Sequence, residues 1–442
     1  MLGWRSKRFG LALVMAASLA GAGLTGCATS NPLSIDLMPA PEAFDDGAMN
    51  PLPQHNPIAD LPYGGMLYAT DRAPVAAGED GHYSSLRGQV LRLGAAKVAV
   101  GETNITWEEA RRISLLKNRP GSYPLKVTGV VEFGPLDTTL TPLVDPGPAP
   151  ADPKAAGRTF AGAIDAKLSG AAEKDVYIYV HGYKVGFENP ILVGSELWHF
   201  LGYKGVFIAY SWPATPKASA YIGDSDTAAG MARNLRELVA FIEANTQAER
   251  IHIIGYSAGT RLVARAVEQM AMFNQGAGER RLGAKLENVI LVGSDIDRAV
   301  FGAYLADGVA DVPRRWTIYV SGTDSALRFS SLLAGHARLG RMWRNQELTP
   351  QIASYLKSHE GRVDMVNVTG VAGAETANGH GYFRSSPWVS SDVLMTLAYN
   401  LSPEERGLVR DPATGLAQFP TDYVERMRSV LAVKYAPKPG GP

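Results

Sequence analysis

Short apolar runs alternate with segments of helical periodicity through the second half of the chain. Six runs are rich in Val, Ile and Tyr, as buried strands are, and lie at 176–180, 206–210, 251–254, 289–292, 316–320 and 363–368. Between and after them, apolar positions recur at helical spacing over residues 227–244, 258–272 and 387–401. This alternation predicts an α/β fold with a mostly parallel central sheet and helices on both faces.

Three more apolar runs, at 66–70, 96–100 and 127–133, predict strands that precede this region. Residues 27–61 are rich in Pro, Ala, Asn and Asp without any period, which predicts a flexible tether. A second proline-rich stretch predicts a long surface loop at about 134–158 rather than a domain boundary. We therefore expect one α/β domain over residues 62–442.

The composition is compatible with a large hydrophobic core and excludes several classes of function. The 442 residues are 46% hydrophobic and 19% charged, and their formal net charge of zero does not suggest nucleic acid binding. Cys27 is the only cysteine, which excludes disulfides and cysteine-based metal sites. Motifs typical of zinc, P-loop and dinucleotide sites are missing, so we expect neither a metal nor a cofactor.

The amino terminus is typical of a targeting signal. Residues 1–26 hold three basic residues and no acidic one, and their apolar run is too short for a stable membrane span. They lead into Leu24-Thr25-Gly26-Cys27, which resembles the bacterial lipoprotein box, where the cysteine is lipidated and becomes the mature amino terminus. We expect a lipid anchor on Cys27 in the cell envelope. Inner-membrane lipoproteins commonly have aspartate where this chain has Ala28, which favours the outer membrane, facing the periplasm.

The motif Gly255-Tyr256-Ser257-Ala258-Gly259 stands where a strand-like run meets a helix-like run. On a sharp strand-to-helix turn, Ser257 would be exposed above the sheet, and the two glycines would let neighbouring backbone pass closely. The helix would direct its first N–H groups and the positive end of its dipole toward a developing oxyanion. The motif predicts that Ser257 is a nucleophile, and the alternative is a tight turn with an inert serine.

A serine nucleophile needs a general base, and the base needs a partner that holds its tautomer. Three histidines follow Ser257 in the chain. His359 precedes the last predicted strand, at the wrong end of the sheet, and His336 falls in a helix or loop segment. His380 follows that strand through a glycine-rich loop that can bring an imidazole over Ser257, so His380 is the candidate base.

Two carboxylates are candidates for the partner of this base. Asp324 follows the strand at 316–320, at the usual place for the acid, and Asp295 follows the preceding strand and is the alternative. Either aspartate could instead cap a helix. The oxyanion would be stabilised by two backbone donors, the N–H of Ala258 and the N–H of Tyr183 in the loop after the strand at 176–180.

Aromatic residues near the expected mouth of the site could line an acyl pocket. They are Phe187, Trp212 and Tyr256, although aromatic residues at strand ends more often belong to the core. His181 precedes the nucleophile in the chain, and we expect it to brace its loop rather than to act as a base.

Seven motifs are spread over residues 62–400: Tyr68-Ala69-Thr70-Asp71-Arg72, His181-Gly182-Tyr183, Ser211-Trp212-Pro213, Gly255-Tyr256-Ser257-Ala258-Gly259, Asp295-Ile296-Asp297, Ser321-Gly322-Thr323-Asp324-Ser325-Ala326-Leu327 and His380-Gly381-Tyr382-Phe383. In these motifs the chain resembles the bacterial α/β-hydrolase family catalogued as domain of unknown function 900. The resemblance implies a serine-hydrolase fold over most of the chain and strengthens the roles given to Ser257, Asp324 and His380. It does not imply a defined substrate. The long proline-rich insert and the lipoprotein leader depart from the family.

Together these features predict a lipid-anchored serine hydrolase that cleaves a carboxylic ester through an acyl-enzyme on Ser257. The substrate would be a small-molecule or lipid ester, and amide hydrolysis or acyl transfer would use the same residues. The membrane would be reached through Cys27, and no nucleic acid partner is expected. The alternative from another class is a catalytically silent, envelope-associated binding or scaffold lipoprotein that keeps the fold for packing alone.

Overall fold

The computed structural model describes residues 33–45, 49–61, 63–101, 105–142, 152–276, 278, 281–343 and 349–435. The strands among these residues are β1 (Ser34–Asp36), β2 (Met66–Pro74), β3 (Tyr83–Val100), β4 (Pro124–Pro135), β5 (Asp175–Val180), β6 (Val206–Ser211), β7 (Arg250–Tyr256), β8 (Leu286–Val292), β9 (Arg315–Val320), β10 (Val363–Asn367), β11 (Val409–Arg410) and β12 (Ala417–Gln418). The predictions for residues 1–26 and for Cys27 lie outside the described residues, as does part of the proline-rich loop.

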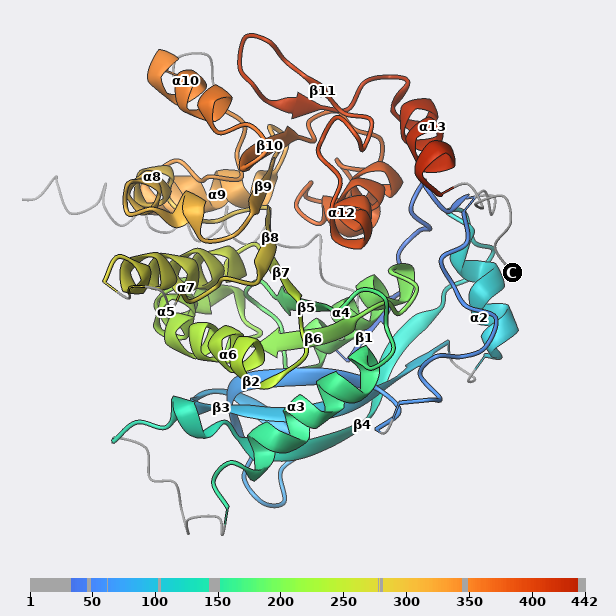
Figure 1. Ribbon diagram of the computed structural model, residues 1–442, viewed down its shortest axis with the longest axis vertical. Helices are drawn as coiled ribbons and strands as arrows, with labels where there is room; N and C mark the ends of the chain where they lie inside the picture. Colours follow the sequence, from blue (N-terminus) through green and yellow to red (C-terminus); the bar gives the residue numbers. More distant parts are fainter. Residues whose placement is uncertain are drawn as a thin grey trace, which may run out of the picture.

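The described strands form one twelve-stranded sheet in the order β1-β4-β3-β2-β6-β5-β7-β8-β9-β10-β12-β11 (Figure 1). The eight strands from β2 to β12 in this order pair in parallel. The strands β3, β4 and β1 at one end, and β11 at the other, pair antiparallel. The predicted α/β fold with a mostly parallel sheet is confirmed, and its parallel strands bring their carboxyl ends to one edge of the sheet.

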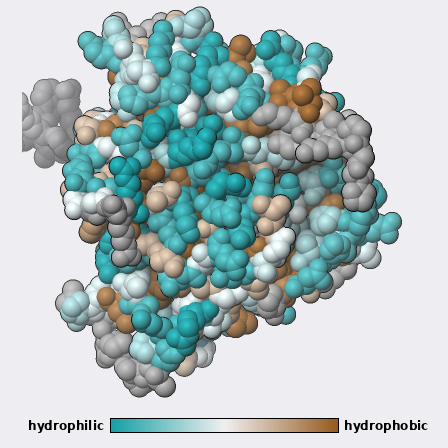
Figure 2. Space-filling view, in the orientation of Figure 1, coloured by the Kyte–Doolittle hydropathy of each residue, from teal (hydrophilic) through white to brown (hydrophobic). Residues whose placement is uncertain are grey.

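Helices cover both faces of the sheet and create two hydrophobic cores. One core lies under α3 (Ala155–Leu168), α6 (Ala232–Asn245), α7 (Gly259–Asn274) and α8 (Arg298–Ala306). The other lies under α2 (Trp107–Ser114), α4 (Glu188–Phe200), α12 (Pro387–Tyr399) and α13 (Tyr423–Tyr435). The other α-helices among the described residues are α5 (Tyr221–Gly230), α9 (Ser325–Ala334), α10 (Pro350–Ser358) and α11 (Tyr382–Ser385). Polar side chains cover most of the molecular face drawn in Figure 2.

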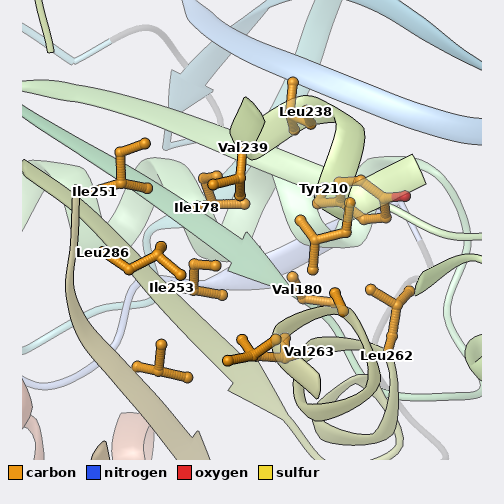
Figure 3. Close-up of a cluster of buried hydrophobic side chains, with 14 of the residues drawn as sticks. Ile178, Val180, Tyr210, Leu238, Val239, Ile251, Ile253, Leu262, Val263 and Leu286 are labelled. Atoms are coloured by element: carbon orange, nitrogen blue, oxygen red, sulfur yellow. The ribbon is translucent and has the colours of Figure 1, made fainter. Parts of the chain in front are cut away.

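Strand β5 is buried along its whole length because it faces both cores. Its side chains alternate between the two faces, so Ile178 and Val180 enter one core while Tyr177 and Tyr179 enter the other. Figure 3 shows the first of these cores, where side chains of β5 and β7 meet those of α6 and α7. This packing explains why the strand appears in the sequence as a continuous apolar run without polar alternation.

The helix expected over 227–244 is two helices, α5 and α6, with a break at Met231. Gly230 ends the first of them, and glycine is among the least favourable residues in a helix interior. The helices expected at 258–272 and 387–401 correspond to α7 and α12.

The prediction of a flexible tether over residues 27–61 is wrong for residues 34–45, which we call the N-terminal segment. It begins with β1, which pairs with β4, continues without regular structure to Pro41 and ends in a turn. Its Leu37, Met38 and Phe44 side chains are buried in the second core. Pro39 and Pro41 interrupt any regular strand pattern, because proline lacks the N–H that a ladder needs. The apolar residues therefore have no period from which their burial could be predicted.

No helix among the described residues is long and apolar enough to cross a membrane.

The two-sided burial of β5 makes a stability prediction. Ile178 has no solvent exposure, so Ile178→Ala should lower the free energy of unfolding by about 2–5 kcal/mol through lost burial and a residual cavity. Leu86→Ala is a control, since Leu86 is 71% exposed and its loss should change the free energy by less than about 0.5 kcal/mol. Denaturant unfolding measures both, and an equal effect of the two substitutions would contradict the assigned packing.

Candidate active site

Ser257 occupies a strained turn between β7 and α7. Its φ of +52° lies in the left-handed region, which costs a residue with a side chain about 1–3 kcal/mol. The Ser257 N–H donates to the carbonyl of Val292 at the end of β8, at 2.9 Å, which fixes the turn against the neighbouring strand. The predicted strand-turn-helix arrangement at Ser257 is therefore present in the structure, and its hydroxyl stands at the carboxyl edge of the sheet.

Two glycines allow the loop after β5 to touch this turn. A Cβ on Gly259 would lie 2.2 Å from the carbonyl oxygen of His181, where there is no room for one. A Cβ on Gly182 would lie 2.9 Å from the Cβ of Ser257 and 3.4 Å from its Oγ. The backbone of His181 and Gly182 thus passes close to the turn that carries Ser257.

His380 and Asp324 complete a chain of hydrogen bonds from Ser257. The Nε2 of His380 is 2.8 Å from the Oγ of Ser257, and its Nδ1 is 2.6 Å from Oδ2 of Asp324. All three residues are less than a tenth exposed. The structure thus brings together the three residues that the sequence proposed, although 123 positions separate Ser257 from His380.

Asp324 has two functions at once. Its Oδ1 accepts the N–H of Leu327 at 2.9 Å and caps α9, while Oδ2 binds the imidazole of His380. The two readings of this aspartate, orienting acid and helix cap, are therefore compatible. The cap holds the carboxylate in one orientation, which in turn fixes the tautomer of His380 with a proton on Nδ1 and a lone pair on Nε2 facing Ser257.

The electrostatics of His380 result from opposing effects. Burial of the imidazole lowers its pKa, but the charge of Asp324 and the hydrogen bond to it raise the pKa more, and Asp295 adds a further increase. The net effect is a pKa above the usual 6.5. An imidazole with a raised pKa is a stronger base and stabilises the positive charge that it would acquire.

Asp295, the alternative acid, belongs to a different network. Its carboxylate accepts hydrogen bonds from Tyr221 at 2.6 Å, from Arg261 at 3.0 Å and from Ser330 at 2.5 Å, and it lies 3.3 Å from Nε of Arg338. These partners use both carboxylate oxygens, whereas the Nδ1 of His380 is bound to Asp324. The structure therefore favours Asp324 over Asp295 as the partner of the imidazole.

The two expected oxyanion donors belong to two segments that meet at Ser257, the start of α7 and the loop after β5. Ala258 is the N-cap residue of α7, and the first N–H groups of a helix have no intrahelical acceptor. Tyr183 follows Gly182, whose backbone contacts the Ser257 side chain. Lys184 then turns the chain away with a φ of +67°. This arrangement supports the N–H groups of Ala258 and Tyr183 as candidates for the oxyanion hole.

Arg72 donates hydrogen bonds to this loop, a role that the sequence did not reveal. Its buried guanidinium donates to the carbonyls of Val185 at 2.9 Å and Ala214 at 3.1 Å, and to Oγ of Ser211 at 3.0 Å. Burial lowers its pKa to about 10, so Arg72 keeps its charge at neutral pH. The motif at residues 68–72 contains this arginine, but no local pattern indicates which groups it binds.

His181 braces the same loop, as expected. Its ring stacks on Trp212 with centroids 5.1 Å apart, and the indole N–H donates to the His181 carbonyl at 2.7 Å. Burial, with a further contribution from the nearby charge of Arg72, lowers the pKa of His181 to about 3. The imidazole is therefore neutral at ordinary pH.

The aromatic residues proposed for an acyl pocket divide into two groups. Phe187 is buried against Tyr68 and Tyr83, and Trp212 is buried against His181. These contacts favour a packing role for both. Tyr256 is partly exposed and lies 5.1 Å from the His380 ring, so Tyr256 remains the pocket candidate.

Tyr382 holds the His380 loop against the sheet and was also not assigned from sequence. Its hydroxyl accepts the N–H of Gly293, after β8, at 2.7 Å, and donates to the carbonyl of Tyr319 in β9 at 3.4 Å. Gly293 lets the imidazole come close, since a Cβ there would lie 2.8 Å from Cε1 of His380. The motif at 380–383 contained this tyrosine, but nothing local indicated its acceptor and donor.

Among the residues that the structure describes, no group of three or more His, Cys, Asp or Glu side chains could hold a metal ion. The side chains around Ser257 instead form a proton-transfer path with backbone donors beside it. Such an arrangement can activate a hydroxyl and stabilise an oxyanion.

Comparison with known proteins adds one finding. Residues 158–397 match the family model described as "Alpha/beta hydrolase of unknown function (DUF900)". The matched region contains Ser257, Asp324 and His380, and the strands β1 to β4 precede it. No curated protein matches the chain.

The balance of effects on His380 predicts how its pKa responds to substitution. Asp324→Asn removes a charge that raises the pKa, so the pKa of His380 should fall, while Asn still caps α9. Asp295→Asn should lower the pKa less, because Asp295 is the smallest of the raising causes. NMR titration of the His380 imidazole measures both shifts. A larger fall with Asp295→Asn would transfer the orienting role to Asp295.

Proposed function

Because the chain belongs to the DUF900 family of α/β hydrolases of unknown function, we propose that it is a serine hydrolase that cleaves carboxylic esters through an acyl-enzyme on Ser257. The observation that carries the proposal is the chain of hydrogen bonds at 2.8 and 2.6 Å that joins Ser257, His380 and Asp324. The left-handed backbone of Ser257 supports it further, because this conformation is expected of a nucleophile on a sharp strand-to-helix turn.

The first half of the reaction forms the acyl-enzyme. His380 takes the proton of Ser257 at Nε2 as Oγ attacks the ester carbonyl, and the carbonyl oxygen becomes an oxyanion beside the N–H groups of Ala258 and Tyr183. When the tetrahedral intermediate collapses, the bond to the alkoxy oxygen breaks and His380 returns the proton to the leaving alcohol. Asp324 keeps the imidazole oriented and stabilises its positive charge.

In the second half of the reaction, water hydrolyses the acyl-enzyme by the same steps. His380 removes a proton from water, the hydroxide oxygen attacks the acyl carbon, and Ser257 leaves with the proton back on its Oγ. The products are a carboxylic acid and the regenerated serine. Amide hydrolysis would differ in the leaving amine, and acyl transfer would differ in using an alcohol or amine in place of water.

A silent scaffold of the same fold is the competing function. It predicts a folded protein whose Ser257 does not react with an electrophile that requires an activated serine. A fluorophosphonate probe distinguishes the two, because it forms a covalent bond with a serine oxygen only when a base removes the proton.

Substitution of the nucleophile and the base tests the assignment. Ser257→Ala and His380→Ala should each lower ester turnover by roughly 10³-fold or more, because such residues act as a unit. Turnover of p-nitrophenyl esters of graded chain length measures the loss and reports the preferred acyl length. Wild-type turnover should also fall as pH drops through the raised pKa of His380, since only the neutral imidazole accepts a proton.

Ser294→Ala provides a matched control. Ser294 is buried at the end of the neighbouring strand β8, but its hydroxyl bonds Thr260 rather than His380. Probe labelling and turnover should survive in this variant. Near-normal turnover in a folded Ser257→Ala protein would contradict the proposal.

We also propose that the protein is a lipoprotein anchored through Cys27 in the bacterial outer membrane, facing the periplasm. Support comes from the basic and apolar leader and from the box Leu24-Thr25-Gly26-Cys27. A lipid ester or a small ester at the membrane face would be within reach of such an enzyme.

Cys27→Ala tests the anchor separately from the chemistry. The substitution should abolish incorporation of labelled fatty acid and release the protein from the membrane fraction, while the purified protein keeps its turnover of a soluble ester. Equal membrane binding of wild type and Cys27→Ala, or no label on the wild type, would show that the leader is not a lipoprotein signal.

A further inference from the structure

The N-terminal segment reaches the residues that follow His380. Arg384, in α11 one turn beyond the imidazole, donates to both carboxylate oxygens of Glu196 at 2.5 and 3.0 Å, and to the carbonyl of Asp36 at 2.9 Å. The same Oε1 of Glu196 accepts the N–H of Met38 at 2.5 Å. Glu196 therefore joins α4, the N-terminal segment and α11 at a single buried carboxylate.

Two more hydrogen bonds continue the contact along the chain after α11. The N–H of Glu42 donates to the carbonyl of Pro387 at 3.0 Å, and the N–H of Ala43 donates to Oγ of Ser391 at 3.0 Å. Both acceptors belong to the first turns of α12. The segment thus runs beside the chain from Arg384 to Ser391, immediately after the imidazole.

The other side of the N-terminal segment is fixed to the early part of the domain. Its strand β1 pairs with β4, and the N–H of Leu37 donates to the carbonyl of Tyr123 at 3.0 Å. Arg119 donates to the carbonyls of Leu37 at 2.7 Å and Met38 at 2.5 Å. The segment therefore connects a rigid antiparallel sheet to the loop that carries the base.

The Glu196–Arg384 pair cannot be lost without consequence for this loop. Glu196 has no solvent exposure, and a buried carboxylate is strongly unfavourable when its cation is removed. A planar guanidinium donates to two oxygens in a fixed geometry. The ion pair therefore fixes the orientation of α11 as well as its distance from Glu196. The loop before His380 is held separately, because the carbonyl of Asn378 accepts the N–H of Ser325 at the start of α9 at 3.0 Å. The Glu196–Arg384 pair adds the constraint on the side that follows the imidazole.

We propose that the N-terminal segment, Glu196 and Arg384 form a positioning device that sets the location of His380 relative to Ser257. The proposal rests on the proposed serine hydrolase function and extends it to residues 34–45, which lie outside the family match. Arg384 and Glu196 act through the backbone of α11 and are positioning residues, not groups that touch the substrate.

The primary test is Arg384→Gln in the full chain, with Arg250→Gln as its matched control. Arg250 also binds a buried carboxylate through two bonds, to Asp175 at 2.6 and 2.9 Å, but at the end of β7 opposite to Ser257. Arg384→Gln should lower kcat and the rate of fluorophosphonate labelling by about 10- to 100-fold with KM nearly unchanged, because a displacement of about 1 Å can cost 100-fold. Arg250→Gln should leave both rates within about twofold of wild type, because the Arg250–Asp175 pair lies at the opposite end of β7 from the reacting atoms.

A spectroscopic readout separates positioning from loss of stability. The proton between Nδ1 of His380 and Asp324 should give a low-field NMR resonance, which depends on the geometry of that hydrogen bond. The resonance should shift or broaden in Arg384→Gln and remain in Arg250→Gln. Arg384→Lys should recover part of the labelling rate, since lysine restores the charge but not the two parallel bonds.

A second pair of variants tests the N-terminal segment itself if Arg384→Gln does not fold. Met38→Ala and Met38→Pro both remove the buried side chain, but only proline also removes the N–H that Glu196 accepts. Met38→Pro should label more slowly than Met38→Ala by several-fold or more.

The outcomes separate the two proposals. If wild type does not react with the probe, the serine hydrolase function fails and the positioning proposal fails with it. If wild type reacts, and Arg384→Gln or Met38→Pro labels as fast as its own control with an unchanged low-field resonance, the function stands and the positioning proposal is overturned.

Discussion

The left-handed backbone of Ser257 is the constraint on which the rest of the site depends. A residue with a side chain occupies this conformation only when its surroundings hold it there. Here the holding groups are the carbonyl of Val292 in the next strand, the start of α7, and the loop after β5 that touches Gly259. The same contacts place the oxyanion candidates beside the hydroxyl, so the strain and the chemistry have one structural cause. The sheet supplies the stiffness, because its strands on either side of β7 are buried on both faces.

Around this turn, burial and neighbouring charges shift the pKa of each ionisable group differently. His380 has a raised pKa because Asp324 outweighs burial, whereas the His181 ring contacts backbone carbonyls and burial lowers its pKa to about 3. Asp71 is buried beside Tyr210 and Asn234, and burial raises its pKa to about 7 despite those hydrogen bonds. Of the two buried histidines near Ser257, only His380 is therefore suited to gain and lose a proton near neutral pH. Both histidines are buried, so the carboxylate of Asp324 beside His380 accounts for the difference between their pKa values.

Sequence patterns identified the parts of the site that depend on local order or on strand ends. Ser257 was found because strand, turn and helix signals are contiguous, and Asp324 and His380 because parallel strands bring their carboxyl ends to one edge. The Glu196–Arg384 pair could not be found in this way, since 188 positions separate its members and each would be an ordinary charge on a helix. The order of the N-terminal segment could not be predicted for a related reason. Its order comes from contacts with β4, α4 and α12, and its prolines remove the periodicity that burial usually leaves in a sequence.

The ordered N-terminal segment also changes the geometry of the proposed anchor. An extended chain spans at most about 3.3–3.6 Å per residue, so Leu33 would lie within about 20 Å of a lipidated Cys27. A flexible tether that continued to residue 61 would have let the domain move farther from the membrane and turn more freely. With the shorter connection, the part of the domain nearest the anchor is the segment that contacts Glu196, Arg384 and α12. The carboxylate that ties this segment to α11 would then lie between the membrane attachment and the base, which favours substrates presented at the membrane face over those deep in the periplasm.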